Sequence, residues 1–225
     1  MIPTPTYSHL SAADFDDVYE PAEDTFILLD ALEQDQDILK GSRVCLEVGS
    51  GSGCVSAFLG AVCGKSSALY LTTDLNPPST LATLRTGAAN SVPLLPVLTD
   101  LTASLLPRLE RQVDVLIFNP PYVETDDAEA VEAQEEGVIE RAWAGGKGGM
   151  RVTDRLLAQV ETLLSLRGVF YLVAVPQNKP LEILRQMKET HGLHGEITLK
   201  RRAGREHLHV LRFSRPEHPD IPCPA

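Results

Sequence analysis

Residues 119–122 read Asn-Pro-Pro-Tyr and follow the apolar segment "VDVLIF". Neither proline can donate a backbone hydrogen bond, and each fixes its own φ. The residue before a proline is also held out of the helical region, so we expect Asn119 to be extended. A strand that ends this abruptly predicts a rigid group at its end, and the first candidate is the carboxamide of Asn119.

Two oxygen atoms of this motif could hold a planar NH₂ group. The side-chain oxygen of Asn119 and the backbone carbonyl of Pro120 both accept hydrogen bonds, and an NH₂ group carries two donors. A carboxamide nitrogen is a poor nucleophile because its lone pair is delocalised, and the sequence shows no strong base that could deprotonate it. Positioning would therefore supply the catalysis, with Pro121 as a brace and Tyr122 packed against the planar group.

A glycine-rich loop, "LEVGSGSG", ends an apolar strand and opens a helix. Gly49, Gly51 and Gly53 would let a ligand approach the backbone closely, with amide groups pointing at it. A tight strand-to-helix turn is the alternative, although one glycine would suffice for that. The GxGxG spacing also departs from the GxGxxG of dinucleotide sites, which argues against a dehydrogenase.

Polar residues follow the next strands at corresponding places. Asp74 ends the second predicted strand, Asp100 the third and Asn119 the fourth. In open α/β sheets, ligands bind outside the carboxyl ends of the strands, so these residues and the glycine loop would line one crevice. An acid such as Asp74 could accept hydrogen bonds from both ribose hydroxyls. A single Asp at a strand end is more often a helix cap. Four successive strands that end in a glycine loop, two Asp residues and an Asn together predict a cofactor site.

Strands alternate with helices along the chain, which predicts a doubly wound, Rossmann-like α/β fold. Two prolines place the third strand at an edge of the sheet, and residues 196–214 alternate like a hairpin that turns near residues 203–204. Residues 123–150 show no period. The strands are expected at 42–49, 68–76, 93–100, 112–119 and 169–176, and the helices at 21–35, 54–64, 153–168, 180–192 and from residue 77 onward.

Composition narrows the class of protein. The 225 residues carry a net charge of −11, which opposes a broad basic face for nucleic acid. No apolar run is long enough to span a membrane, and "MIPTPTYSHL" lacks the pattern of a signal peptide, so the cytoplasm, and also the nucleus, is the expected location. Cys45, Cys54 and Cys63 lie among apolar residues, which indicates buried side chains and no metal site.

The motifs together resemble a known family. "DVYEPAEDTFILLDAL", "CLEVGSGSG", "FNPPYV" and "AWAGGKGG" are similar to the HemK-type glutamine methyltransferases, in the short eukaryotic and archaeal branch that modifies translation termination factors. The resemblance spans residues 14–214 and implies a seven-stranded S-adenosylmethionine-dependent methyltransferase fold with a C-terminal antiparallel hairpin. The implied activity is transfer of a methyl group to the N5 amide of a glutamine in the Gly-Gly-Gln motif of a class I release factor.

The resemblance also implies roles for individual residues. Glu47 and the glycine loop would hold the methionine part of the cofactor, Thr25 its amino-acid end, Asp74 the ribose, and Asp100 with Leu101 the adenine. The full cofactor set is Tyr19, Thr25, Glu47, Gly49, Gly51, Gly53, Asp74, Asp100, Leu101 and Asn119. The catalytic and substrate-binding set is Asn119, Pro120, Pro121, Tyr122 and Val123.

A small zinc-binding activator subunit is a further implication, and we hypothesise that it extends the sheet at the edge strand "PLLPVLT". Bacterial members carry a helical N-terminal domain for docking the release factor, whereas this chain has some forty residues before its first strand. The expected organisation is an arm and helix over 1–40, a methyltransferase domain over 41–215 and a flexible tail over 216–225. Residues 140–149, with Trp143, are interpreted as a flap, and the basic stretch 199–215 as an exposed hairpin face.

Other functions stay open at this point. Asn-Pro-Pro-Tyr also resembles the motif of adenine-N6 DNA methyltransferases, because an exocyclic amine is a planar NH₂ group as well. Those enzymes need a basic strand-gripping surface, which the charge of −11 disfavours. Protein lysines or small molecules could be secondary acceptors. A cofactor-binding module without catalysis would not need an intact Asn119.

Overall fold

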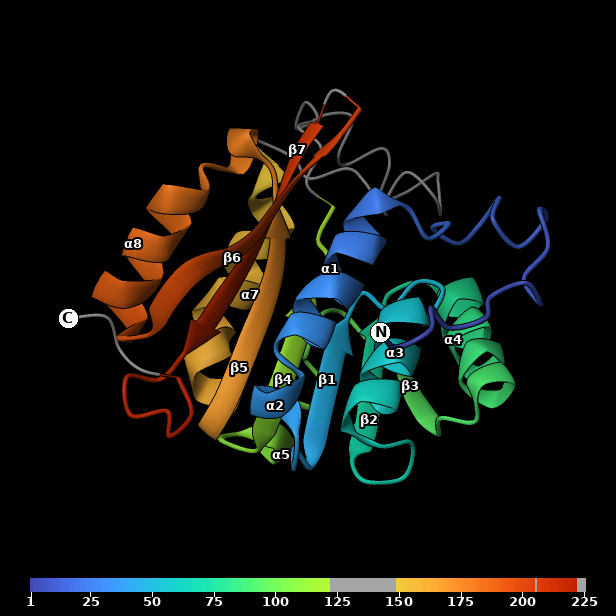
Figure 1. Cartoon of the computed structure of the whole chain (residues 1–225), viewed down its shortest axis with the longest axis horizontal. Coiled ribbons are helices and arrows are strands. Elements are labelled where there is room, and N and C mark those ends of the chain that lie inside the picture. Colours follow the sequence, from blue (N-terminus) through green and yellow to red (C-terminus); the bar gives the residue numbers. More distant parts are fainter. Residues whose placement is uncertain (122–148, 205, 222–225) are drawn as a thin grey trace.

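A seven-stranded sheet carries helices on both faces in the computed structural model of the chain (Figure 1). The structure describes residues 1–121, 149–204 and 206–221. The strand order is β3-β2-β1-β4-β5-β7-β6, so the chain starts in the middle of the sheet, moves to one edge and returns to build the other. The predicted Rossmann-like fold with a C-terminal antiparallel hairpin is confirmed.

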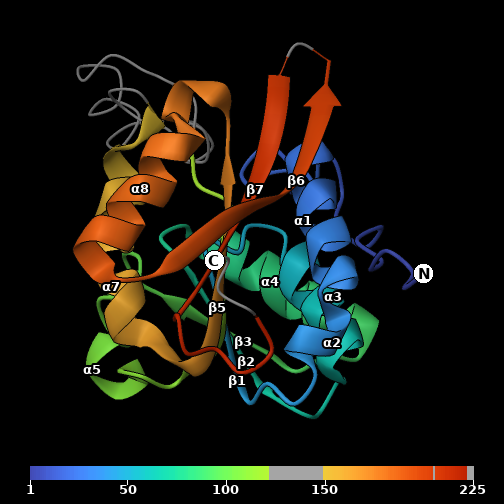
Figure 2. The ribbon, with the colours of Figure 1, turned by 60° about the vertical axis from the view of Figure 1, so that its left-hand side comes forward.

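Five neighbouring strands are parallel, and the last two form an antiparallel hairpin whose tip stands beyond the sheet (Figure 2). Strands β1, β4 and β5 are buried for most of their length, as expected for parallel strands covered on both faces. The strands are β1 (Val44–Val48), β2 (Leu69–Asp74), β3 (Leu94–Leu98), β4 (Val113–Phe118), β5 (Leu164–Ala174), β6 (His194–Ala203) and β7 (Glu206–Ser214).

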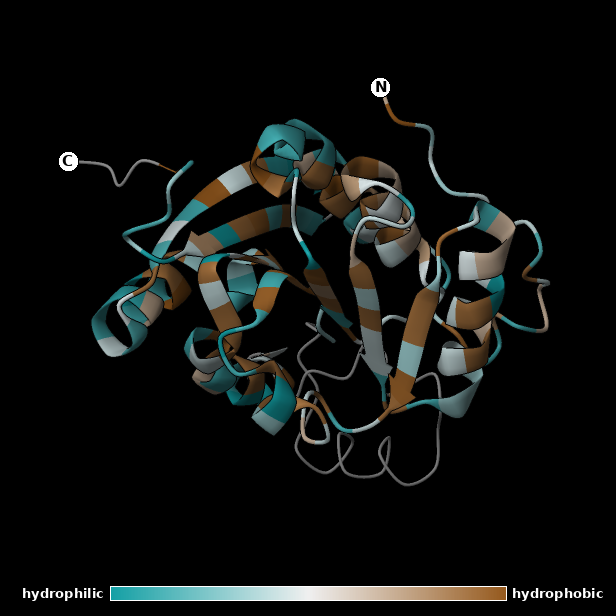
Figure 3. Ribbon diagram, turned by 90° about the horizontal axis from the view of Figure 1, so that it is seen from below, coloured by the Kyte–Doolittle hydropathy of each residue, from teal (hydrophilic) through white to brown (hydrophobic). Residues whose placement is uncertain are grey.

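The helices divide between the two faces, as the view from below shows (Figure 3). One apolar layer packs α1 and α3 against the sheet, with Cys45 and Cys54 buried in it and Cys63 partly buried. The other layer packs α7 and α8 against the opposite face. The helices are α1 (Glu23–Gln34), α2 (Gln36–Leu39), α3 (Cys54–Cys63), α4 (Pro77–Asn90), α5 (Leu106–Leu109), α7 (Arg151–Leu163), the 3₁₀ turn η3 (Pro176–Asn178) and α8 (Pro180–His191).

Most predicted elements lie where their sequence patterns put them, and β3 is an edge strand as its prolines indicated. The predicted helix over 153–168 is wrong at its end, because α7 stops at Leu163 and β5 already begins at Leu164. Leu164 pairs with Val113 of β4, so pairing with a strand distant in sequence overrides the local helical pattern. Gly168 supports this pairing, since a Cβ there would lie 2.6 Å from the Val113 carbonyl oxygen.

The N-terminal arm, residues 1–20, packs against α4. Leu10 and Val18 form a small apolar cluster with Ala82. The backbone of Thr6 exchanges two hydrogen bonds with the Asn90 side chain, each 2.9 Å long. The arm is therefore held against α4 by apolar and polar contacts before the chain enters α1.

A nearly buried polar network joins the helix layer to the hairpin. Asp35, between α1 and α2, accepts a 2.7 Å hydrogen bond from the Tyr171 hydroxyl of β5 and forms a 2.7 Å ion pair with Arg212 of β7. Arg212 also pairs with Glu196 of β6. Burial and the Asp35 carboxylate raise the pKa of Tyr171, which keeps its hydroxyl a donor.

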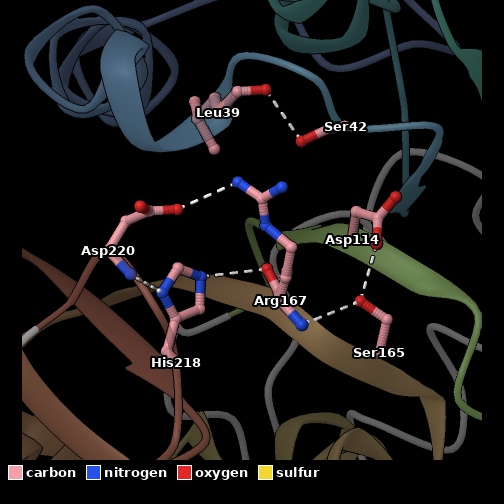
Figure 4. A network of polar contacts seen from close by, with 7 residues as sticks. All are labelled: Leu39, Ser42, Asp114, Ser165, Arg167, His218 and Asp220. Atoms are coloured by element: carbon pink, nitrogen blue, oxygen red, sulfur yellow. Dashed lines mark hydrogen bonds and ion pairs between the residues drawn. The ribbon is translucent and has the colours of Figure 1, made fainter.

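Residues 216–221 lie against the amino end of β5, although the sequence places them in a flexible tail (Figure 4). His218 is buried, its Nε2 lies 3.0 Å from the Arg167 carbonyl oxygen, and its Nδ1 accepts from the Asp220 amide. Arg167 pairs with Asp220 at 2.9 Å. Apolar burial of Ile221 adds to these contacts, and polar composition alone gives no sign of them.

Across the described ranges, no helix is both long and apolar enough to cross a bilayer.

The Asp35 network yields a stability prediction. Asp35→Ala removes a carboxylate that the buried Tyr171 hydroxyl and the largely buried Arg212 share, so we expect the free energy of unfolding to fall by about 3 kcal/mol. Urea denaturation monitored by circular dichroism measures this change. Asp37→Ala is the matched control, because the Asp37–Lys40 pair is exposed and is expected to contribute less than about 1 kcal/mol. Equal losses for the two variants would contradict the prediction.

Candidate active site

The site lies at the carboxyl ends of β1, β2 and β4. Val48 of β1 is in register with Thr73 of β2 and with Phe118 of β4. The next residue of each strand therefore reaches the same level, which places Gly49 between Asp74 and Asn119. Neighbouring strands are about 4.8 Å apart, so three of the predicted site residues meet at one edge.

Glu47 is buried beneath the glycine loop. Its carboxylate accepts a 3.0 Å hydrogen bond from the Ser56 amide and a second one from the Ser56 hydroxyl. Burial raises the pKa of Glu47 from its ordinary 4.5 to about 8, with Ser56 opposing this shift and Asp74 adding to it. A buried carboxyl of this kind is suited to a cationic group of a ligand, which would favour its ionised form. Sequence reasoning missed Ser56, whose signal is a lone hydroxyl in the apolar helix α3.

All three glycines of the loop have positive φ, at 68° for Gly49, 50° for Gly51 and 76° for Gly53. Gly53 has a second constraint, because a Cβ there would lie 2.8 Å from the Thr83 Cα of α4. A Cβ at Gly49 or Gly51 would meet only ordinary contacts, so these two positions need glycine for their conformation.

The loop amides do not point at a ligand as the sequence predicted. The amides of Gly49 and Ser50 donate to the Thr73 carbonyl, at 2.8 and 3.1 Å, and the Gly53 amide donates to the Ser50 carbonyl at 2.7 Å. The Gly51 amide donates to Asp74 Oδ2 at 2.9 Å. The prediction is wrong for these four groups, because the tight turn satisfies its own backbone.

Asp74 therefore holds the glycine loop from the carboxyl end of β2. Its Oδ2 accepts from Gly51 and its Oδ1 accepts from the Asn76 amide at 2.8 Å. Burial raises the pKa of Asp74, with these backbone donors opposing the rise. Each carboxylate oxygen has a second lone pair, so Asp74 keeps capacity for the two ribose hydroxyls expected of it.

Tyr19 and the first turn of α1 form a group of contacts beside the glycine loop. A Cβ at Gly51 would lie 3.9 Å from the Tyr19 Cβ, so Tyr19 lies over the loop. The Tyr19 hydroxyl donates to Asp24 at 2.9 Å, and the Thr25 amide donates to Asp24 at 2.6 Å. The Thr25 hydroxyl accepts from the Ala22 amide at 3.3 Å. Asp24 is buried and was missed, although its place before Thr25 in an acidic first turn is a signal.

Asp100 and Leu101 follow β3 on the other side of Asp74. The Asp100 carboxylate is partly exposed and pairs with Arg155 of α7 at 2.6 Å. Leu101 is buried with a positive φ of 49°, which is unusual for a residue with a branched side chain. The turn after β3 thus holds a fixed, strained shape beside the position expected for the adenine.

The side-chain oxygen of Asn119 is the next feature of the site. Within the described residues, this oxygen, Oδ1, is buried and has no hydrogen-bond partner. A buried acceptor without a donor is unfavourable, so this atom fits a ligand that brings an N–H or O–H group. Pro120 is buried and Pro121 is partly exposed. Tyr122, Val123 and the expected flap with Trp143 lie outside the described residues.

The assembled residues fit a nucleoside linked to an amino acid. Asp74 can take vicinal hydroxyls, Glu47 can take a cation, and Asn119 offers an acceptor that has no partner in the described part of the chain. Within residues 1–121, 149–204 and 206–221, no three His, Cys, Asp or Glu side chains gather where they could hold a metal ion.

Comparison with known proteins decides the family. No protein-family model matches the sequence. The chain is 53% identical to the mouse protein named methyltransferase HEMK2 over 214 residues, which cover 95% of this chain and 97% of that protein. It is 40% identical to the fission-yeast "eRF1 methyltransferase catalytic subunit mtq2" over 228 residues, with 96% of each chain covered. The chain belongs to the HemK-type methyltransferase family.

A solved structure agrees in fold. The Mtq2–Trm112 complex of E. cuniculi, described as responsible for methylating the termination factor eRF1, matches with a TM-score of 0.64 and 28% identity, and covers 88% of this chain and 99% of that chain. The cofactor of this methyltransferase family member is S-adenosylmethionine, as the motifs indicated. The roles assigned to individual residues stay predictions.

The state of Glu47 predicts how cofactor binding depends on pH. In the free chain Glu47 keeps its proton up to about pH 8, whereas a cationic cofactor favours the carboxylate, so binding should release a proton. We expect the affinity for S-adenosylmethionine to rise between pH 6 and 8, by up to about tenfold per pH unit. Titration calorimetry in buffers with different ionisation enthalpies measures both the affinity and the released proton.

Two variants accompany this measurement. Glu47→Gln should flatten the pH profile and weaken binding, and Glu189→Gln on the exposed face of α8 should change neither. A proton count of zero for the unmodified chain would contradict the role given to Glu47.

Proposed function

We propose that the chain methylates the N5 amide of a glutamine in the Gly-Gly-Gln motif of a class I release factor, with S-adenosylmethionine as methyl donor. The observation that supports this most directly is the buried Asn119 Oδ1, which has no partner among the described residues and lies level with the glycine loop. That atom can accept one N–H of a target amide, and the Pro120 carbonyl can accept the other.

Positioning is the contribution of these two acceptors. The cofactor supplies the methyl group. Holding both N–H groups aims the amide nitrogen and stabilises the positive charge that develops on it during transfer. Pro120 and Pro121 restrict the backbone that carries the carbonyl, which keeps this acceptor in place. Tyr122 and Val123, beyond the described residues, complete the proposed contact with the planar amide.

The relatives support the substrate class. The fission-yeast relative is named an eRF1 methyltransferase, and the E. cuniculi complex is described as methylating the same factor. Exocyclic amines of nucleic acid are the competing acceptor, which the net charge of −11 disfavours, and protein lysines are the alternative secondary acceptor. Since release factors work in translation, we place the activity in the cytoplasm.

Asn119→Ala tests the proposal. Loss of the Oδ1 acceptor should lower methyl transfer at least about hundredfold and leave the dissociation constant of the cofactor within about threefold. The assay is transfer of labelled methyl to a release factor, to its Gly-Gly-Gln→Gly-Gly-Ala variant and to adenine-bearing DNA, with mass spectrometry to identify the labelled residue.

Gln186→Ala, an exposed amide on α8, is the control and should be fully active. Label on DNA but not on the factor would refute the glutamine assignment. Undiminished turnover by Asn119→Ala would refute the role of that side chain.

A small zinc-binding subunit bound at β3 completes the proposal. β3 is the outer strand of the sheet, so its free side leaves backbone groups available for another strand. Leu95 and Leu98 of β3 are 44% and 56% exposed, and Leu81 and Leu84 are exposed on α4, which packs along β3. An apolar sheet edge of this kind suits a permanent partner, and the E. cuniculi relative was solved with Trm112.

The double variant Leu95→Asp/Leu98→Asp should lose this partner. Each leucine that the proposed interface buries would contribute roughly 1.5–3 kcal/mol, so we expect the affinity for the subunit to fall at least about hundredfold. Co-expression with a tagged subunit and surface plasmon resonance measure the loss. Leu166→Asp/Leu181→Asp is the control, since these leucines are 69% and 72% exposed on β5 and α8. Unchanged affinity of the β3 variant would place the interface elsewhere.

A further inference from the structure

The hairpin of β6 and β7 reaches past the edge of the sheet where the site lies. Phe118 of β4 is in register with Leu172 of β5, so Pro120 is level with Ala174, and Ala174 is in register with His209 of β7. β7 is two strands away from β4, which is about 10 Å. The three residues from His209 back to Glu206 extend about another 10 Å beyond that level. The hairpin tip therefore extends beyond the edge of the sheet at which the candidate site lies (Figure 2).

A β-bulge decides which side chains each face of the tip presents. The register of β6 shifts between Ile197 and Leu199. Ile197 packs in the layer with α7 and α8, so in a regular strand Leu199 would follow it there. The extra residue reverses this alternation, and Leu199 instead packs in the layer with α1. Lys200 and Arg202 are thereby directed away from α1.

The face toward α1 is filled. Leu199 and Ala203 pack against its apolar layer, and Arg201 forms ion pairs with Asp30 and Glu23 of α1. Two further basic residues, in β7 and just after it, also have ion-pair partners: Arg212 pairs with Asp35 and Arg215 with Glu161.

The opposite face is a short basic surface. Lys200 is in register with His209, and Arg202 with His207, so the four side chains share one face, which we call the basic hairpin face. Lys200 and Arg202 are exposed, and neither has an ion-pair partner among the described residues, although Arg202 Nε donates to the Gly204 carbonyl. Burial, with Lys200 nearby, lowers the pKa of His209, so Lys200 and Arg202 supply the charge.

We propose that the basic hairpin face binds an acidic segment of the protein substrate, outside its methylated loop. The inference rests on the proposed function and adds the feature of the substrate that this face recognises. In a chain of net charge −11, an acidic partner is repelled overall, so a local positive surface beyond the sheet edge that carries the candidate site would select the partner's orientation. Two fixed charges suit a few carboxylates, whereas RNA binding requires a broad basic surface.

Charge reversal separates docking from chemistry. The chain, co-expressed with its partner subunit, is assayed on an intact release factor and on a short peptide that carries only the Gly-Gly-Gln loop. Lys200→Glu/Arg202→Glu should raise KM for the intact factor about tenfold, with kcat within about twofold. Turnover of the peptide should be unchanged. The salt dependence of kcat/KM for the intact factor should also weaken.

Arg185→Glu/Lys188→Glu is the matched control. Both residues are exposed on α8, neither has an ion pair among the described residues, and the change in net charge is identical. It should leave KM for both substrates within about twofold, and thermal unfolding should be the same for both double variants.

Three results would overturn the proposal. Equal KM values for the hairpin and control variants would show that only net charge matters. An equal loss with the peptide would place the hairpin at the chemistry instead of at a docking site. The third result concerns RNA. If a single-stranded RNA oligonucleotide inhibits the unmodified chain but not the hairpin variant, and the variant's KM for the factor is unchanged, the face would be assigned to RNA. An unmodified chain inactive on both factor and peptide would instead refute the proposed function itself.

Discussion

The parallel pairing of β1 with β2 and β4 is the constraint on which the site depends. Val48 is held level with Thr73 and Phe118, so the residues that follow them emerge side by side. Parallel strands cannot be joined by tight turns, and the helices that connect them cover both faces of the sheet. The burial that stabilises the sheet and the geometry that gathers Gly49, Asp74 and Asn119 therefore have a single origin.

Polar groups at this edge divide into those the protein satisfies and those it leaves open. The amides of the glycine turn are used by Thr73, Ser50 and Asp74, which makes the loop rigid. Glu47 is held by Ser56, and Asn119 Oδ1 has no partner within the described part of the chain. The neighbouring polar groups already have their hydrogen-bond partners and hold Asn119 Oδ1 in place. This arrangement favours catalysis by positioning over catalysis by a strong base.

The two edges of the sheet have opposite character. β3 carries exposed leucines and has no neighbouring strand on its outer side among the described residues. β6 carries basic residues beyond the end of the sheet. A bulge of one residue separates the apolar side of that hairpin from its charged side. The same core thus presents two surfaces with different physical chemistry, one suited to lasting apolar association and one to electrostatic selection.

The sequence by itself determined the alternation of strands and longer helices, the edge position of β3 and the hairpin, and it supplied the residues proposed for the site. These features follow from the hydrophobic period, the prolines and the glycines, which act over a few residues. Tertiary structure alone decided where α7 gives way to β5, the burial of His218 and Ile221, and the internal use of the loop amides. It also decided the burial of Asp24 and Glu47 and the direction of Lys200 and Arg202. Each of these depends on partners distant in the chain, since burial and strand register are properties of the assembled sheet.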